Sequence, residues 1–243
     1  MVYLSIVIPA YNEEERIASA LLKVINFLSV KKYLWEIIVV DDGSTDRTSE
    51  AVEKLIKNDE RLAVIKNSVN RGKGYSIRTG VFASKGEVIL FSDADLSTPI
   101  EELDKILPLI HVGYDIVIGS RALPNSIVEV PQSWHRQTMG KIFNILVRLF
   151  ILNGFKDTQC GFKCFKREAA MRIFSLQRIS GFAFDVEILL IAKRLGLKIK
   201  EAPVRWINSP ESKVNLISGS LSMLFELLKI KLYDWRRCYY PLV

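Results

Sequence analysis

Glu87-Val88-Ile89-Leu90-Phe91-Ser92-Asp93-Ala94-Asp95 places two acidic residues directly after a run typical of a buried strand. Thr98-Pro99 ends this pattern a few residues later. Two carboxylates are therefore expected at the carboxyl end of a central strand, where open α/β sheets usually bind ligands. Alternate residues of an extended chain point to opposite faces, so Asp93 and Asp95 can serve one site only if the backbone bends there.

The pair of carboxylates predicts a site for a divalent cation. Negative charges this close repel each other, and a cation relieves that repulsion. Mg²⁺ or Mn²⁺ prefers hard oxygen ligands and leaves part of its coordination shell to substrate phosphates. The alternative is that Asp93 and Asp95 only form a turn and cap the following helix. A bare D-x-D motif often matches by chance, so the remaining motifs must distinguish the two interpretations.

The composition is that of a globular protein with a substantial core, since 49% of the 243 residues are hydrophobic and 25% are charged. The length suits one large domain, or one domain with a small appendage. The net charge of +7 predicts an anionic partner, which could be nucleic acid, an acidic lipid surface or a phosphorylated substrate. The sequence contains no arginine-rich helix and no aromatic ladder, so specific nucleic-acid binding is not expected.

Targeting and cysteine patterns favour an intracellular location. The start of the chain predicts no secretory signal, and the uncharged residues 214–225 are too few to cross a bilayer, which takes about 20 apolar residues. Three cysteines form no paired framework and fit a reducing compartment. Cys160 and Cys164 could provide half of a zinc site, but the sequence has only two histidines, so buried structural cysteines are the better interpretation.

Short apolar runs alternate with helical patterns through the first half of the chain. The expected strands are residues 4–9, 35–41, 62–66, 88–92 and 116–120, and helical patterns lie between them. This alternation predicts an α/β fold with a mostly parallel central sheet flanked by helices. A polar loop follows each strand: residues 9–14, 41–46, 70–74, 93–95 and 119–121. Because these loops should meet at one edge of the sheet, we expect a binding cleft there.

Two common nucleotide motifs are excluded. The glycines at 72 and 74 are followed by Ile77 where the dinucleotide motif needs its third glycine, and they follow the third strand rather than the first. The sequence also contains no G-x-x-x-x-G-K-[ST] stretch. A nucleotide would therefore be bound in another way.

The second half carries two apolar helical stripes. The first comprises Met139, Ile142, Phe143, Leu146, Leu149 and Phe150, and the second comprises Leu221, Leu224, Phe225, Leu228, Leu232 and Trp235. Such stripes usually belong to a core, but basic residues beside them leave an interfacial membrane helix equally open. Between the stripes we expect short helices at 167–174 and 184–195, and an edge strand at 199–206 interrupted by Pro203.

Three motifs of the first half occur in a fixed order: Ser5-Ile6-Val7-Ile8-Pro9-Ala10-Tyr11-Asn12-Glu13, Val39-Val40-Asp41-Asp42-Gly43-Ser44-Thr45-Asp46 and Ser92-Asp93-Ala94-Asp95. They resemble the signature of family-2 inverting glycosyltransferases. The second half contains Asp157-Thr158-Gln159-Cys160-Gly161-Phe162-Lys163, Phe184-Asp185-Val186-Glu187, Val204-Arg205-Trp206 and Ser212-Lys213. These resemble the polyprenyl-phosphate hexosyltransferases, and the dolichyl-phosphate β-glucosyltransferases most, with dolichyl-phosphate mannose synthase a near relative. The resemblance covers about residues 4–213.

The resemblance implies a fold and a set of site residues. Its members adopt the nucleotide-diphospho-sugar transferase fold, which is GT-A-like. Carried over motif by motif, it places the nucleotide against Pro9, Ala10, Tyr11, Glu13, Asp41, Asp42 and Lys73. It assigns the metal–diphosphate to Asp93 and Asp95, with Ser97 contributing to the metal shell, and it adds Ala94 and Gln159 to the substrate site. Many members carry a membrane anchor, whereas attachment here would have to be peripheral.

The acceptor explains why no general base is evident. A lipid phosphate is anionic at pH 7 and can attack directly, so the protein needs only to desolvate, orient and clamp it. Arg121, Arg136 and Lys213 are the candidate cations, although each could be an ordinary surface charge. Asp185 and Glu187 are candidates for orienting sugar hydroxyls or a phosphate-binding cation, and their alternative is helix capping.

These observations predict an inverting transfer of a hexose to a polyprenyl phosphate. The expected donor is UDP-glucose, and the alternatives are GDP-mannose or another sugar nucleotide, or an inactive lipid-binding member of the fold. We expect residues 1–213 to form the catalytic domain, divided into a nucleotide-sugar half at 1–121 and an acceptor half at 122–213. Residues 214–243 would form an amphipathic helix on the inner, cytoplasmic face of a membrane. The sequence leaves open whether the protein is a monomer or a homo-oligomer.

Overall fold

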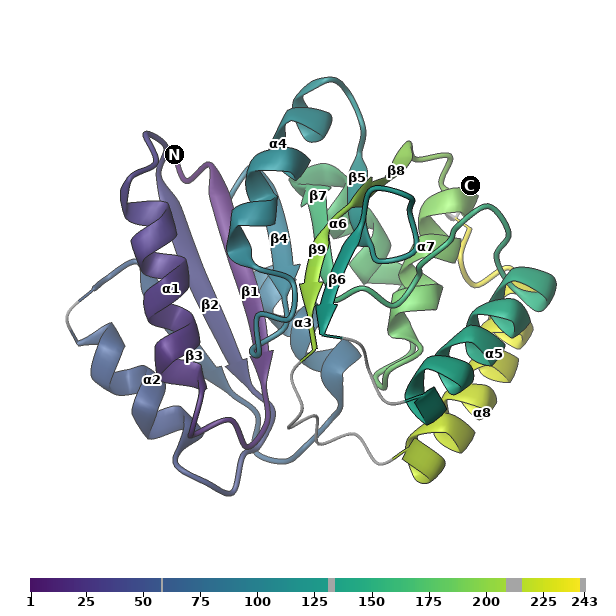
Figure 1. Ribbon diagram of the computed structural model, residues 1–243, viewed down its shortest axis with the longest axis horizontal. Coiled ribbons are helices and arrows are strands. Elements are labelled where there is room, and N and C mark those ends of the chain that lie inside the picture. Colours follow the sequence, from purple (N-terminus) through teal and green to yellow (C-terminus); the bar gives the residue numbers. More distant parts are fainter. Residues whose placement is uncertain (58, 131–133, 209–215, 241–243) are drawn as a thin grey trace.

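A seven-stranded sheet with strand order β3-β2-β1-β4-β7-β5-β8 forms the centre of the molecule (Figure 1). The computed structural model describes residues 1–57, 59–130, 134–208 and 216–240. The strands are β1 (Leu4–Ala10), β2 (Trp35–Asp41), β3 (Leu62–Lys66), β4 (Val88–Ser92), β5 (Ile116–Ser120), β7 (Phe162–Lys166) and β8 (Ile199–Pro203). β7 runs antiparallel to its neighbours β4 and β5, and the other neighbouring pairs are parallel. The predicted mostly parallel sheet is therefore confirmed.

Helices cover both faces of this sheet. Successive residues of a strand point to opposite faces, so Ile6 and Ile8 of β1 belong to one hydrophobic cluster and Val7 to the other. The first cluster includes side chains from α1 (Ile17–Ser29), α2 (Thr48–Ile56) and α4 (Leu103–His111), which follows the short 3-10 helix η1 (Ile100–Glu102). The second includes side chains from α3 (Lys73–Ala83), α6 (Arg167–Leu176) and α7 (Phe184–Arg194). Burial on both faces explains why the central strands are continuously apolar.

The antiparallel strand β7 was not anticipated from the sequence. Its pairing with β4 sets Ser92 opposite Phe162, so residues 157–161 approach the sheet at the edge where β4 ends. The expected edge strand with an interruption at Pro203 is confirmed as β8, but the residues after Pro203 do not continue it and form a separate strand, β9 (Arg205–Ile207). β9 pairs with β6 (Ile127–Val130) in a second, two-stranded sheet. These connections bring the second half of the chain to the same edge as the polar loops of the first half.

Two long helices, α5 (Trp134–Phe150) and α8 (Leu216–Trp235), lie side by side at one end of the molecule (Figure 1). Lys231 of α8 donates a hydrogen bond to the Phe150 carbonyl at 2.9 Å. Of the described residues, none belongs to a helix long and apolar enough to cross a membrane.

The apolar stripes of α5 and α8 are mostly exposed. Leu149 is 72% exposed and Phe225 is 65% exposed, whereas Val147, Leu227 and Ile230 are buried and attach the two helices to the core. A core role is therefore wrong for the exposed members of both stripes: Ile142, Leu149 and Phe150 on α5, and Leu224, Phe225, Leu228, Leu232 and Trp235 on α8. The side chain of Leu221 lies outside the described residues.

Candidate active site

The turn after β4 brings two carboxylates to the carboxyl edge of the sheet. Leu96 adopts a positive φ of 48°, and its backbone N–H donates to the Asp93 carbonyl at 3.1 Å. The Ser97 N–H donates to Asp95 Oδ1 at 2.9 Å. Burial, followed by the charge of Asp93, raises the pKa of Asp95, which means that the two carboxylates lie close enough to repel each other. The backbone bend that Asp93 and Asp95 need in order to serve one site is therefore present.

A series of alternating charges, partly exposed at Asp93 and Lys73 and buried at Asp185 and Lys163, supports this turn. Lys73, the first residue of α3, places its Nζ 2.6 Å from Asp93 Oδ1. Burial acts to lower the pKa of Lys73, but the charges of Asp93 and Asp185 outweigh it and raise that pKa. Asp185, in the first turn of α7, accepts a hydrogen bond from Lys163 of β7, and both side chains are buried. Four separate elements thus fix the charge pattern around Asp93.

Glycine is required where β7 approaches this turn. A Cβ atom at Gly161 would overlap the Asp93 carboxylate. Gly72, directly before α3, has a φ of +98°, and a Cβ there would overlap the Ser180 carbonyl. These two positions let the 157–161 segment and the start of α3 close around the acidic turn.

A second charged pair lies where β5 ends. Arg121 donates from Nε and Nη2 to the two carboxylate oxygens of Asp157, at 2.6 and 2.9 Å. Although burial acts to raise it, the charge and hydrogen bonds of Arg121 lower the pKa of Asp157 to about 2. The Arg121 guanidinium also lies 5.4 Å from the centre of the Trp206 ring. The bidentate geometry holds the arginine rigidly at the edge of the sheet.

Buried polar atoms beside this pair have no partner among the described residues. They are Ser120 Oγ, Thr158 Oγ1, Gln159 Nε2 and Arg205 Nε. Buried donors and acceptors are nearly always satisfied, so a group of orphaned atoms marks a place for a ligand or water. The atoms belong to β5, β9 and the segment before β7, which meet at the edge of the sheet that carries Asp93.

Two predicted nucleotide-binding residues, Asp41 and Asp42, fix the loops after β2 and β3. Asp41 is buried and accepts hydrogen bonds from Ser44 N and from the Ser49 hydroxyl. Asp42 accepts from Asn67, from Arg71 N and from Gly72 N, so it fixes the loop before α3. These carboxylates therefore shape the loops, and direct contact with a nucleotide stays a prediction.

The remaining predicted residues differ in their position, burial and partners. Pro9 and Ala10 end β1, and Tyr11 follows with 41% of its surface exposed. Glu13 forms an ion pair with Arg16. Ala94 and Ser97 lie within the acidic turn and are buried, and Glu187 accepts hydrogen bonds from the backbone at Arg178 and Ile179. Arg136 lies in α5, although its side chain is outside the described residues, and so is all of Lys213.

Three residues that matter at the site received no role from the sequence. Lys163 anchors Asp185, Asp157 anchors Arg121, and the charge of Arg16 lowers the pKa of Asp95 against the larger effect of burial. Lys163 lies between Phe162 and Cys164 in a buried strand, where a lysine needs a partner of opposite charge. That unusual position is the signal that could have identified it.

The chain matches known proteins over most of its length. Residues 5–174 match the model of "Glycosyl transferase family 2". The chain is 37% identical to "Dolichyl-phosphate beta-glucosyltransferase" of Dictyostelium discoideum, covering 95% of this chain and 74% of the relative. It belongs to glycosyl transferase family 2. The enzyme of the same description from Saccharomyces cerevisiae is 38% identical to this glycosyltransferase, covering 95% and 75% of the two chains.

Solved structures identify the fold of this family-2 glycosyltransferase. Glucosyl-3-phosphoglycerate synthase from Mycobacterium tuberculosis, crystallised with Mn²⁺, uridine diphosphate and glucosyl-3-phosphoglycerate, superposes with a TM-score of 0.69. The similarity covers 99% of this chain and 81% of that chain, at 23% sequence identity. The predicted GT-A-like fold is confirmed, with Asp93 and Asp95 at the carboxyl edge of its sheet.

Proposed function

We propose that this glycosyltransferase transfers glucose from UDP-glucose to a dolichyl-type polyprenyl phosphate and inverts the configuration of the sugar. The main support is its similarity to enzymes named dolichyl-phosphate β-glucosyltransferase. The enzymes of that name from Dictyostelium discoideum and Homo sapiens are 37% and 38% identical to it, over 95% and 94% of this chain. The acidic turn, the anchored Arg121 and the exposed helices α5 and α8 fit the three requirements of this reaction: a diphosphate leaving group, a phosphate nucleophile and a membrane-borne acceptor.

The acidic turn suits a divalent cation. Burial and the charge of Asp93 raise the pKa of Asp95, and a cation between the two carboxylates would relieve both effects. Within the described residues no group of three or more His, Cys, Asp and Glu gathers around one point, so Asp93 and Asp95 would be the main protein ligands. Donor phosphates and the nearby Ser97 would complete the shell. Bound Mg²⁺ or Mn²⁺ stabilises negative charge on a departing nucleoside diphosphate.

The loops after β1 and β2 would hold the nucleotide. Pro9 and Ala10 present a short backbone segment at the end of β1, and the partly exposed Tyr11 offers a ring face beside it. Lys73 would place its ammonium group near the donor phosphates, because its ion pair with Asp93 holds it at the acidic turn. Glu13 and Asp41 would line the same end of the sheet.

The acceptor phosphate would be held near Arg121. Two of its five N–H donors bind Asp157, so the others remain to bind a phosphate. The orphaned groups of Ser120, Thr158 and Gln159 could satisfy the sugar hydroxyls or the phosphate oxygens. Attack in line with the departing diphosphate would give a β-linked product from an α-linked donor. Arg136 and Lys213 are further candidates for the acceptor clamp.

The exposed faces of α5 and α8 would lie on the membrane surface. Leu149, Phe225 and Trp235 project large apolar side chains outward, and basic residues such as Arg148 and Arg236 accompany them. An interfacial helix buries its apolar face among lipid head groups while its cations attract anionic lipids. We place this peripheral attachment on the cytoplasmic face.

The function is tested by incubating the purified protein with Mg²⁺, a short polyprenyl phosphate and either UDP-glucose or GDP-mannose. Glucolipid from UDP-glucose alone supports the proposal. Mannolipid from GDP-mannose alone keeps the mechanism and refutes the donor. Release of nucleoside diphosphate without any glycolipid refutes the acceptor, and an absence of both products favours an inactive lipid-binding protein of this fold.

A further inference from the structure

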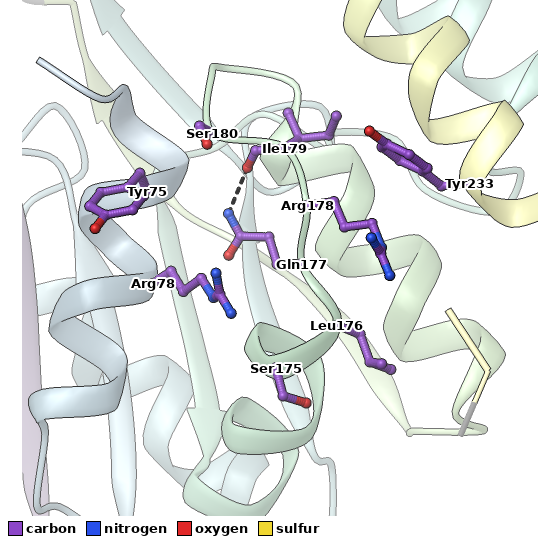
Figure 2. A pocket seen from close by; sticks show the side chains of 9 residues that line it. All are labelled: Tyr75, Arg78, Ser175, Leu176, Gln177, Arg178, Ile179, Ser180 and Tyr233. Carbon is purple, nitrogen blue, oxygen red and sulfur yellow. Dashed lines mark hydrogen bonds between the residues drawn. The ribbon is translucent and has the colours of Figure 1, made fainter. Parts of the chain in front are cut away.

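A cavity lies between α3, the end of α6, the segment that follows it and α8. Its volume is about 450 Å³. Figure 2 shows the residues that line it, which come from α3, α6, the segment after α6 and α8: Tyr75, Arg78, Ser175, Leu176, Gln177, Arg178, Ile179, Ser180 and Tyr233. The lining contains two arginines and no acidic residue, so the cavity is electropositive.

Neither arginine has an ion-pair partner among the described residues. Arg78 donates from Nε to the Phe174 carbonyl at 2.9 Å, which fixes the guanidinium and leaves its two terminal nitrogens for another acceptor. The Arg178 guanidinium lies 5.5 Å from the centre of the Tyr233 ring. The buried carboxylate of Glu187 accepts hydrogen bonds from the backbone N–H groups of Arg178 and Ile179 and from the Tyr239 hydroxyl, and the charge of Arg178 also acts on it.

Neutral polar groups complete the lining. The Tyr75 hydroxyl accepts a hydrogen bond from Arg71 at 3.0 Å, so its own proton remains available to a ligand. Gln177 is buried, and its amide nitrogen donates to the carbonyls of Gly74 and Ile179. Its carbonyl oxygen has no partner within the described part of the chain, and it faces the Arg78 side of the cavity in Figure 2. The Gln177 oxygen can only accept a hydrogen bond, so its partner in a ligand would be a protonated oxygen, whereas the Tyr75 hydroxyl can donate to an unprotonated one.

We infer that this cavity binds a phosphoryl group. Two guanidinium groups from different elements can grip a tetrahedral oxyanion from two directions, and hydroxyl donors can reach its remaining oxygens. The cavity shares α8 with the exposed apolar stripe, because Tyr233 is adjacent to the exposed Leu232. A phosphate monoester could therefore come from solution or from a lipid head group. The lining of the cavity shares no residue with the metal, donor and acceptor sites proposed above.

The cavity also contacts the first turn of α3. Ser180 accepts hydrogen bonds from Gly74 N at 2.7 Å and from Tyr75 N at 3.2 Å, directly after Lys73. A bound phosphoryl group would stabilise residues 175–180 against local opening. Amide hydrogen exchange in this segment should slow when the ligand binds.

The test compares the wild-type protein with an Arg78→Gln, Arg178→Gln double variant. Binding of inorganic phosphate is measured by calorimetry, with hydrogen exchange at residues 175–180 as the site-specific readout. Flotation is measured with phosphatidylcholine vesicles that contain either phosphatidic acid, whose head group is a phosphate monoester, or phosphatidylserine at equal total charge. Loss of two charge-assisted contacts should weaken phosphate binding by about tenfold or more.

Arg172→Gln is the matched control, because Arg172 is exposed on α6 and does not line the cavity. If the double variant fails to fold, Arg178→Gln is measured alone. This substitution removes no side-chain hydrogen bond among the described residues, so it should leave the fold intact. An arginine-dependent response to phosphate alone identifies a soluble ligand, and an arginine-dependent preference for phosphatidic acid identifies a head group. Equal phosphate binding and equal flotation in wild type, control and double variant would overturn the proposal.

Discussion

Replacing Asp157 by asparagine should destabilise the protein in a way that depends on pH. The carboxylate is 6% exposed, and it holds Arg121 in a bidentate ion pair. Against the opposing effect of burial, Arg121 lowers the pKa of Asp157 from 3.8 to about 2. A carboxyl group whose pKa is lowered on folding stabilises the folded state above its unfolded-state pKa, and this stability is lost as the pH falls through the folded-state pKa.

The magnitude follows from the two pKa values. At about 1.4 kcal/mol per unit of pKa, the difference between 3.8 and about 2 corresponds to ~2 kcal/mol of folding stability at pH 7. About half of this contribution should be lost by about pH 3, where Asp157 is mostly protonated in the unfolded chain and mostly ionised in the folded one. Urea unfolding of wild type and Asp157→Asn at pH 7, 5, 4 and 3 measures the difference directly.

Asp59→Asn provides the matched control. Asp59 also forms a bidentate pair with an arginine, Arg61, at 2.8 Å for both hydrogen bonds, but Arg61 is half exposed at the surface. Such a pair contributes about 0–1 kcal/mol. A difference between wild type and Asp157→Asn that stays constant from pH 7 to pH 3, or that equals the Asp59→Asn effect, would refute the assignment of this stability to the Asp157 carboxylate.

Three further outcomes are expected. Asp95→Ala should abolish metal-dependent glycosyl transfer while unfolding stays cooperative, whereas the surface variant Asp104→Ala should keep activity; full turnover by Asp95→Ala would refute the metal assignment. Tyr239→Phe should lower the free energy of unfolding in urea by about 1.5–3 kcal/mol, because the buried Tyr239 hydroxyl donates a hydrogen bond to Glu187 at 2.7 Å. An effect no larger than that of Tyr240→Phe would contradict a stabilising role for this hydrogen bond. Phe225→Ser with Leu228→Ser should reduce flotation with anionic vesicles; unchanged flotation would count against α8 as the membrane contact.

The sheet of the first half was predictable because strand and helix periods are local signals. The expected strands at 62–66, 88–92 and 116–120 coincide with β3, β4 and β5, and α3 lies where a helical pattern was expected between the first two of them. β7 was missed because its pairing depends on partners far away in the sequence: Phe162 lies opposite Ser92 and Phe165 opposite Ile116. Phe162–Lys166 is only five residues long and two of them are lysines, so the segment carries no apolar periodicity that identifies a buried strand.

The acidic turn was predictable in position but not in its electrostatics. Its place after β4 follows from the order of residues along the chain, whereas the ion pair of Asp93 with Lys73 depends on where α3 begins. The sequence also could not separate a direct role from a supporting one. Asp42 has the appearance of a ligand-binding residue, yet its oxygens accept hydrogen bonds from Asn67, Arg71 and Gly72. Which groups a loop carboxylate satisfies is set by backbone geometry that no local pattern contains.

The proposed membrane surface and the acidic turn are joined through the start of α7. Glu226 of α8 accepts a hydrogen bond from Ala183 N at 2.9 Å, on the side of the helix opposite to the strongly exposed Leu228. Two residues later, Asp185 binds Lys163 and contributes to the raised pKa of Lys73, against the effect of burial. A displacement of α8 would therefore shift the backbone that positions Asp185, and with it the charge balance at Lys73. If α8 contacts a lipid surface as proposed, this chain of contacts would connect that surface to the proposed donor site.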